Sequence, residues 1–115
     1  ASNYGSAYDV TRLITLAYNS YPDLFSVTSQ PKVDFKTQKY TYTAYNTDKA
    51  IDKIGGLIVS KTGYTISAGG NLAIIYSPFP GKKIAVVVLG SSQDGRFGDM
   101  LTLVNKTNDF LKSYR

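Results

Sequence analysis

The 115-residue sequence contains no cysteine, histidine, tryptophan or glutamate. The absence of cysteine excludes disulfides, thiol nucleophiles and thiolate metal sites. The absence of histidine excludes a Ser-His-Asp arrangement, an imidazole general base and the usual histidine zinc sites. The longest hydrophobic run covers only residues 84–89, far fewer than the ~20 residues of a membrane-spanning helix. Any hydrolytic reaction in this chain therefore depends on Ser, Lys, Tyr or Asp for proton transfer.

The charged residues are few and dispersed. Thirteen Lys and Arg stand against eight Asp, which gives a formal charge of +5. The aspartates form no calcium-binding loop and no pair of catalytic carboxylates, so we expect neither a metal nor a cofactor. With 43% hydrophobic and 18% charged residues, the composition is typical of a globular protein. The length predicts a single domain over residues 1–115.

The basic balance and the 10 tyrosines suggest a nucleic-acid-binding protein as one alternative. Such a protein needs basic and aromatic residues interleaved on one face. Lys39 is close to Tyr40 and Tyr42 in the sequence, but tyrosines in this setting more often cover a sheet. The lysines are otherwise spread almost evenly, which indicates a solvated surface. We therefore predict no nucleic-acid partner.

Hydrophobic spacing predicts an α+β fold. A Ser-x-x-acid pattern, Ser6 to Asp9, precedes helical spacing that ends before Pro22, and residues 23–31 are expected to form a polar connection. A hairpin is predicted at about 33–42, followed by strands at 57–62, 72–76 and 84–89, with the turn 77–81 between the last two. Helical spacing returns from Phe97. We expect a small antiparallel sheet of three main strands plus the hairpin, flanked by an N-terminal and a C-terminal helix.

The most specific motif is Lys61-Thr62-Gly63 at the end of a predicted strand. Its context adds weight, because it is followed by 68–72 (Ala-Gly-Gly-Asn-Leu), by a strand ending in Leu-Gly at 89–90, and by 94–96 (Asp-Gly-Arg). Upstream, residues 3–9 (Asn-Tyr-Gly-Ser-Ala-Tyr-Asp) are similar to the Asn-x-Ser-Thr-Ala-x-Asp helix start of one family. In this order the motifs resemble the D-alanyl-D-alanine carboxypeptidases, low-molecular-mass penicillin-binding proteins among the penicillin-recognising serine hydrolases.

This resemblance implies a penicillin-binding protein/β-lactamase-like fold and a role for five residues. Lys61 supplies a fixed positive charge in catalysis, and the backbone N–H of Tyr64 contributes to the oxyanion hole. Thr62 donates a hydrogen bond to the terminal carboxylate of the substrate, Gly63 lets backbone approach the ligand, and Arg96 holds the same carboxylate. Successive strand residues point to opposite faces, so one cleft receives both Lys61 and Thr62 only if their strand forms its edge.

The implied partners are peptidoglycan stem peptides ending in D-Ala-D-Ala and, for a complete enzyme, β-lactam antibiotics. The implied location is extracytoplasmic, in a bacterial cell envelope or secreted. The resemblance does not imply that the chain alone is catalytic. Catalysis in this family needs a nucleophile motif, Ser-x-x-Lys, and a second motif, Ser-x-Asn. Ser29 to Lys32 fits the first pattern by letters, but alternating rather than helical spacing follows, and Ser-x-Asn is absent.

The family places both motifs upstream of Ala1, and the chain opens without an initiator Met or an apolar signal core. We therefore expect a processed or excised product, the C-terminal portion of a transpeptidase-like domain. It would be the carboxylate-binding half of a D-Ala-D-Ala carboxypeptidase, inactive by itself. The alternative is a noncatalytic peptidoglycan-binding or structural module of the same fold.

The predicted strand at 84–89 is expected to pair with a strand outside this chain. Its continuous apolar run indicates burial on both faces, as in an interior strand. In the complete family fold, strands from the N-terminal part lie beside it. Without them its edge offers unpaired backbone groups. We expect this edge to pair either with the missing N-terminal segment or with a second copy of the chain.

Overall fold

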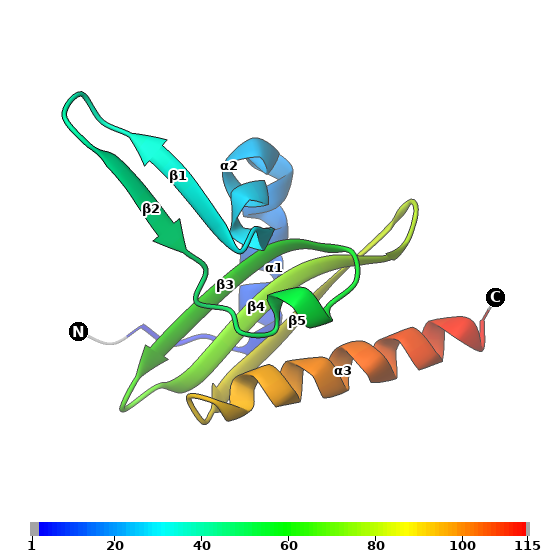
Figure 1. Cartoon of the computed structure of the whole chain (residues 1–115). Coiled ribbons are helices and arrows are strands. Elements are labelled where there is room, and N and C mark those ends of the chain that lie inside the picture. The colour runs from blue at the N-terminus through cyan, green and yellow to red at the C-terminus, as the bar shows by residue number, and fades with distance from the viewer. Residues whose placement is uncertain (1–2, 115) are drawn as a thin grey trace.

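The computed structural model describes residues 3–114, so Ala1, Ser2 and Arg115 lie outside it, including the Ala1-Ser2 opening that we interpreted as a processed start. Three strands form an antiparallel sheet in the order β3-β4-β5, and two more form a separate hairpin (Figure 1). The prediction of an α+β fold with small antiparallel sheets is confirmed. In chain order the elements are α1 (Ala7–Ser20), α2 (Pro22–Ser26), the 3-10 turn η1 (Val27–Ser29), β1 (Lys32–Lys36), β2 (Thr41–Tyr45), the 3-10 turn η2 (Ile51–Lys53), β3 (Leu57–Thr65), β4 (Gly69–Phe79), β5 (Lys82–Ser91) and α3 (Gly95–Lys112).

The first helix begins at the predicted capping pattern. The Ser6 hydroxyl accepts the Asp9 N–H at 3.1 Å, and the Asp9 carboxylate accepts the Ser6 N–H at 3.1 Å. α1 ends at Ser20, before Pro22, as predicted. The prediction of a polar connection over residues 23–31 is wrong, because α2 and η1 occupy most of this range. Pro22 ends one helix and begins the next, since its fixed φ and missing N–H suit a first helical turn.

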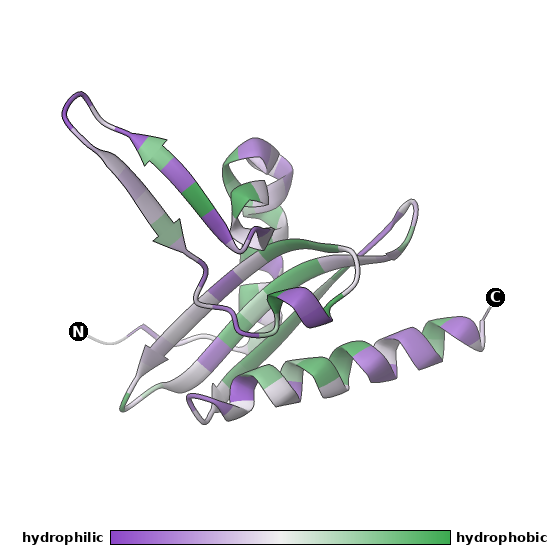
Figure 2. Ribbon diagram, viewed as in Figure 1, coloured by the Kyte–Doolittle hydropathy of each residue, from purple (hydrophilic) through white to green (hydrophobic). Residues whose placement is uncertain are grey.

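The core lies on both faces of the sheet, with one helix against each, as predicted. On one face Leu72, Ile74 and Tyr76 of β4 pack with Met100 and Val104 of α3. On the other face Ala73 and Ile75 of the same strand pack with Ile14 of α1. Every residue from 72 to 76 is buried, which is typical of a central strand covered on both sides. Figure 2 shows hydrophobic residues along these strands.

Two strands extend beyond their predicted ends. β3 continues to Thr65 rather than stopping at residue 62, and β4 runs through most of the predicted turn to Phe79. Phe79 pairs with Lys82, so the turn contains only two residues. The second of them, Gly81, has φ +84°, a left-handed conformation that glycine adopts without strain.

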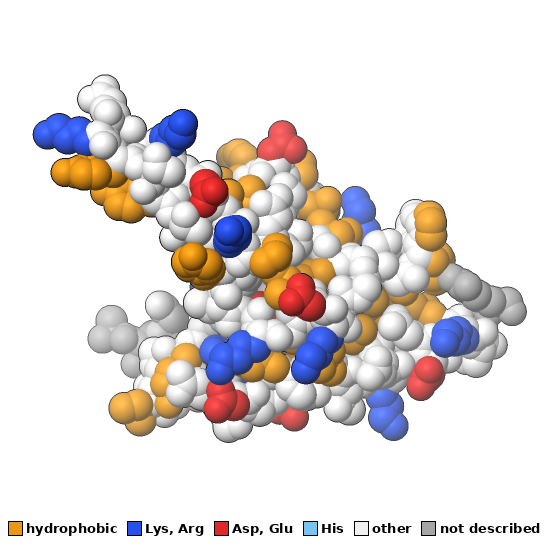
Figure 3. All heavy atoms as spheres, viewed as in Figure 1, with side chains coloured by type: hydrophobic (Ala, Val, Ile, Leu, Met, Phe, Trp, Pro, Cys, Tyr) orange, Lys and Arg blue, Asp and Glu red, His pale blue; other side chains and the backbone are white. Residues whose placement is uncertain are grey.

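The hairpin β1-β2 stands away from the three-stranded sheet (Figures 1 and 3). Phe35 and Tyr42 are cross-strand partners, and their rings stack with centroids 5.4 Å apart. Tyr40 was expected within the hairpin strand but precedes β2, and its ring meets Tyr42 edge-on at 6.1 Å. The hairpin is joined to the body through η1 and through the segment that leads to β3.

The sheet order places β3 and β5 at its two edges. Residues 84–87 of β5 are half-buried, and Leu89 is 40% exposed. Among residues 3–114 no strand pairs with the outer edge of β5. Within the same range no helix is both long and apolar enough to cross a membrane.

Candidate functional site

The Lys61-Thr62-Gly63 motif lies in the second half of β3, at an edge of the sheet. Lys61 is exposed and Thr62 is half-buried. Both nevertheless line the same pocket of about 230 Å³, which lies between β3, η1 and the base of the hairpin. The Lys61 ammonium donates to the Thr62 carbonyl oxygen. The alternation of strand residues allows one cleft to receive both Lys61 and Thr62 only if their strand is an edge strand, and β3 is one.

The pocket has apolar and polar walls. Val27, Val33 and Ala44 supply the apolar wall, whereas Lys61 and Thr62 contribute a charge and a hydroxyl. The remaining lining residues come from η1, the hairpin, the following segment and β3: Thr28, Gln30, Lys32, Tyr45, Asn46, Thr47 and Ser60. The pocket therefore combines hydrogen-bonding groups with a hydrophobic side.

Sequence reasoning missed the partner of the Thr62 hydroxyl. Thr47 Oγ1 lies 2.5 Å from Thr62 Oγ1, a short O–H···O hydrogen bond in which either hydroxyl can donate. Thr47 precedes Thr62 by 15 residues and belongs to the segment between the hairpin and β3. The Asn46-Thr47 pair resembles a piece of the family's sequence, but this resemblance does not indicate a contact with Thr62.

The residues on either side of Thr47 are fixed by hydrogen bonds. Asn46 Nδ2 donates to the carbonyl oxygens of Thr28 at 2.6 Å and Gln30 at 3.0 Å. Asp48 is 2% exposed. Its carboxylate accepts the Ser60 hydroxyl at 2.6 Å and the Ala50 N–H at 2.8 Å.

Ser60 and Thr62 are two positions apart on β3 and bind neighbouring residues of the same segment. Ser60 Oγ donates to Asp48, and Thr62 Oγ1 contacts Thr47. Side chains two positions apart on a strand lie on the same face. The segment is thus fastened along one face of β3, and this fixes the hydroxyl of Thr47 against that of Thr62.

Arg96 reaches the motif from the first turn of α3. Its side chain is only 7% exposed. Nη1 donates to the carbonyl oxygen of Gly63 at 3.0 Å and lies 3.5 Å from that of Asn71. The guanidinium carbon lies 4.7 Å from the centroid of the Phe97 ring. Arg96 and Gly63 are therefore in contact, but neither lines the pocket that contains Lys61 and Thr62.

In the part of the chain that the structure describes, the charge of Arg96 is not paired with a carboxylate. Within residues 3–114 no carboxylate lies within 4.0 Å of the guanidinium. Its buried Nε has no hydrogen-bond partner among the same residues. A buried charge is costly unless it is paired or hydrogen-bonded. Among residues 3–114 the contacts that balance this positive charge are the carbonyl oxygens of Gly63 and Asn71 and the face of the Phe97 ring.

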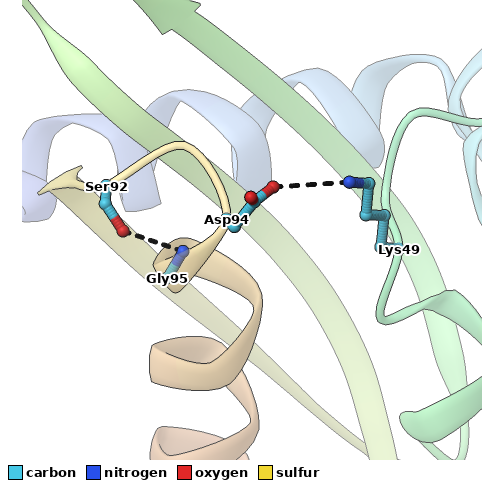
Figure 4. Close-up of polar contacts among 4 residues, drawn as sticks. All are labelled: Lys49, Ser92, Asp94 and Gly95. Atoms are coloured by element: carbon cyan, nitrogen blue, oxygen red, sulfur yellow. Dashed lines mark hydrogen bonds and ion pairs between the residues drawn. The ribbon is translucent and has the colours of Figure 1, made fainter.

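The start of α3, the helix that carries Arg96, is held by polar contacts, and Figure 4 shows those of Ser92, Asp94 and Gly95. The Ser92 hydroxyl accepts the Gly95 N–H at 2.9 Å, which satisfies one of the free donors at the helix start. Asp94 forms an exposed ion pair with Lys49 at 3.3 Å, an interaction that contributes little stability.

Close packing beneath this turn depends on Gly70 of β4. A Cβ at residue 70 would lie 2.1 Å from the carbonyl oxygen of Ser92. The glycine lets the loop before α3 rest on β4, and this brings Arg96 over the end of β3.

The remaining sequence candidates occupy different settings. Tyr64 follows Gly63 in β3, and its side chain is 45% exposed. Ser29 ends η1, and its hydroxyl donates to the Ser26 carbonyl oxygen at 2.9 Å. Lys32 begins β1. The Ser29 to Lys32 pattern therefore does not lie at the start of an α-helix, where the family places its nucleophile motif.

Comparison with known proteins identifies relatives of this fold. The chain is similar to penicillin-binding protein D2 from Listeria monocytogenes in its ampicillin-bound form, with 28% identity and a TM-score of 0.70. The alignment covers 81% of this chain and 37% of that one. The cefotaxime-bound form of the same protein gives 28% identity and a TM-score of 0.69, over 81% and 36% of the two chains.

A more distant structure shows the same fold. It is a D-alanyl-D-alanine carboxypeptidase from Mycobacterium tuberculosis, with 22% identity and a TM-score of 0.55. The alignment covers 68% of this chain and 29% of that one. The chain thus spans about a third of the length of these structures. No curated protein sequence matches it significantly.

The sequence profile of the D-alanyl-D-alanine carboxypeptidase family matches residues 1–93. The matched range includes the whole of Lys61-Thr62-Gly63 and the segment around Thr47, and it ends three positions before Arg96. The match covers most of the chain and agrees with the fold similarity. The chain therefore belongs to the D-alanyl-D-alanine carboxypeptidase family.

Proposed function

We propose that this chain is the carboxylate-binding part of a serine-type D-Ala-D-Ala carboxypeptidase that acts on peptidoglycan stem peptides outside the cytoplasm. The observation that carries the proposal is the buried guanidinium of Arg96, which contacts the Gly63 carbonyl and has no carboxylate partner among residues 3–114. An anionic ligand beside this strand end would complement that charge. The terminal carboxylate of a stem peptide has this chemistry.

The proposed roles follow from the position of each group. The Thr62 hydroxyl donates to the substrate carboxylate, and Lys61 places a positive charge in the same pocket. Gly63 leaves open space beside the strand, because nothing lies within 4 Å of the position its Cβ would take. The backbone N–H of Tyr64 is the proposed oxyanion donor, and the charge of Arg96 adds to the attraction for the carboxylate. This chemistry uses no metal or cofactor.

The nucleophile is proposed to lie on a different segment of the parent enzyme, with residues 1–115 forming the C-terminal portion of its transpeptidase-like domain. The sequence contains no Ser-x-Asn, and its one Ser-x-x-Lys pattern runs from η1 into β1. Penicillin-binding protein D2 is known in ampicillin-bound and cefotaxime-bound forms. We propose that β-lactams likewise bind the complete form of the present enzyme.

The test is labelling with a tagged penicillin, followed by mass spectrometry. We expect no covalent adduct on the 115-residue chain and one adduct, on a serine outside this chain, in the product of the complete gene. An adduct on Ser29 would overturn the assignment of the nucleophile to another segment. If the complete product is also not labelled but binds peptidoglycan, the alternative applies, a noncatalytic peptidoglycan-binding or structural module.

The outer edge of β5 is the proposed contact with the rest of the enzyme. Among residues 3–114 β5 is an edge strand, and the backbone groups on such an edge are a template for another strand. We propose that the N-terminal segment of the parent pairs there, or that a second copy does so when the segment is absent. Sedimentation should then show concentration-dependent association of the 115-residue chain. A monomer at high concentration with fast hydrogen exchange along residues 84–89 would contradict this pairing.

A further inference from the structure

The peptide group between Gly63 and Tyr64 is held from one side. Arg96 Nη1 lies 3.0 Å from the Gly63 carbonyl oxygen and 3.5 Å from that of Asn71, the cross-strand partner of Gly63 on β4. Asn71 Nδ2 also lies 3.5 Å from the Gly63 oxygen. The donors to this carbonyl come from the β4 side, so the carbonyl points toward β4.

The direction of this carbonyl determines the direction of the next N–H. No peptide bond within residues 3–114 is cis, and in a planar trans peptide the C=O and N–H point in opposite directions. The Tyr64 N–H therefore points away from Asn71, toward the outer edge of β3. Because β3 is an edge strand, this is the side from which a ligand can approach the strand.

The charge of Arg96 acts on the same peptide group. A hydrogen bond from a charged donor is about twice as strong as a neutral one. It draws electron density toward the carbonyl oxygen, and linked hydrogen bonds polarise one another. The N–H at the other end of the peptide becomes a stronger donor. Burial of the guanidinium strengthens the effect, because little water screens the contact.

We propose that Arg96 is a positioning residue for the oxyanion hole, which orients and polarises the Tyr64 N–H through the Gly63 carbonyl. This inference rests on the proposed function, since the oxyanion forms only during acyl transfer. In that step the serine loses its proton to a base and its oxygen bonds to the substrate carbonyl carbon. The carbonyl π electrons move to oxygen, and the Tyr64 N–H donates to the resulting anion.

This role adds to the one implied by the family resemblance, in which Arg96 touches the substrate carboxylate. The two roles have different kinetic consequences. A carboxylate contact affects only substrates with a free carboxyl terminus. A positioned oxyanion donor affects the acylation step of every substrate, including those whose terminus is blocked.

The first test examines the peptide group directly by NMR of the full 115-residue chain, without substrate. In the wild type we expect a scalar coupling across the hydrogen bond between an Arg96 Nη and the Gly63 carbonyl carbon. Arg96→Gln should shift the Gly63 carbonyl and Tyr64 amide resonances, and Arg96→Lys should shift them less. Lys49→Gln is the matched control, because it removes a cation near the same helix start but one that contacts Asp94 rather than β3.

The control should leave both resonances in place. Unchanged Gly63 and Tyr64 resonances in folded Arg96→Gln would overturn the proposal. If Arg96→Gln does not fold, the scalar coupling between Arg96 and the Gly63 carbonyl carbon in the wild type decides. Absence of this coupling would contradict the proposal.

The second test uses the complete enzyme with free and blocked substrates. Arg96→Lys should lower kcat on both, by about tenfold or more, since losing a whole oxyanion donor costs 10²–10³-fold. A rise in KM for the free substrate alone, with kcat unchanged, would show that Arg96 only binds the carboxylate. The two failures have different readouts. Absent acylation of the complete enzyme would contradict the proposed function. Unchanged NMR resonances, which require no turnover, would contradict the positioning role of Arg96.

Discussion

The hydroxyl oxygens of Thr47 and Thr62 lie 2.5 Å apart and share a hydrogen bond. Each hydroxyl has a single proton to donate. A substrate carboxylate is only an acceptor, so Thr62 has to donate to it. Thr47 then has to donate to Thr62. The pair therefore sets the direction of the one proton that the proposed function requires.

Thr47→Val removes this donor while keeping a similar shape. We expect the affinity for peptides with a free carboxyl terminus to fall about two- to tenfold, since a net hydrogen bond contributes roughly 0.5–1.5 kcal/mol. Thr47→Ser keeps the hydroxyl and should retain most of the affinity. Isothermal titration with a stem-peptide analogue measures both variants. A loss in Thr47→Ser as large as or larger than that in Thr47→Val would contradict the donor role of the Thr47 hydroxyl.

Asp48→Ala should destabilise the fold. The change leaves the Ser60 hydroxyl and the Ala50 N–H without their buried acceptor, a loss of about 1–3 kcal/mol in the free energy of unfolding. Urea unfolding followed by circular dichroism measures it. Asp94→Asn is the control, because Asp94 forms an exposed ion pair, and its effect should be much smaller. Similar losses in both would argue against a structural role for the Asp48 network.

Two glycine substitutions are expected to change stability in opposite directions. Gly70→Ala would place a Cβ 2.1 Å from the Ser92 carbonyl oxygen, so the loop before α3 has to move, at a cost of about 1–3 kcal/mol. Gly98→Ala meets nothing within 4 Å and lies inside α3, where alanine is favoured over glycine by about 1 kcal/mol. Thermal unfolding of both variants tests this. Destabilisation by Gly98→Ala would contradict the packing described for α3.

Tyr76→Phe should reduce stability in a way that depends on pH. The Tyr76 hydroxyl donates to Asn108 Oδ1 at 2.9 Å, and burial raises the pKa of Tyr76 above its usual value. Below pH ~10 the tyrosine is neutral in both states, and the wild type keeps its full advantage, about 1 kcal/mol. Above that pH the unfolded tyrosine ionises first, so the advantage declines as pH rises toward the raised folded pKa. A constant difference between wild type and variant from pH 8 to 11 would be the contrary result.

Local patterns in the sequence predicted much of the fold. The Ser6 to Asp9 capping pattern and the helical spacing from Phe97 located α1 and α3, and alternation located the hairpin. The short helix α2 was missed because Pro22 is both a helix stop and a good first helical residue. The two-residue turn at Gly81 was missed because residues 77–81 contain turn formers throughout.

The contacts within the site could not be predicted in the same way. The Lys61-Thr62-Gly63 motif located the strand, but the contact of Thr62 with Thr47 joins positions that no local pattern relates. For Arg96 the family resemblance implied only a contact with the substrate carboxylate. Its burial on the Gly63 carbonyl depends on the close approach of α3 to β4, which only the tertiary structure reveals.

The most direct test of the proposed function is a titration of the 115-residue chain with two matched peptides ending in D-Ala-D-Ala, one with a free carboxyl terminus and one amidated. NMR follows the backbone amides of Lys61, Thr62 and Gly63, and Thr62→Val serves as the comparison variant. We predict shifts that saturate with the free peptide and much weaker binding of the amide. Thr62→Val should lower the affinity by about tenfold or more, because a charge-assisted hydrogen bond contributes about 1.5–3 kcal/mol. Equal binding of both peptides, or no shift on β3 with either, would contradict a carboxylate-binding role.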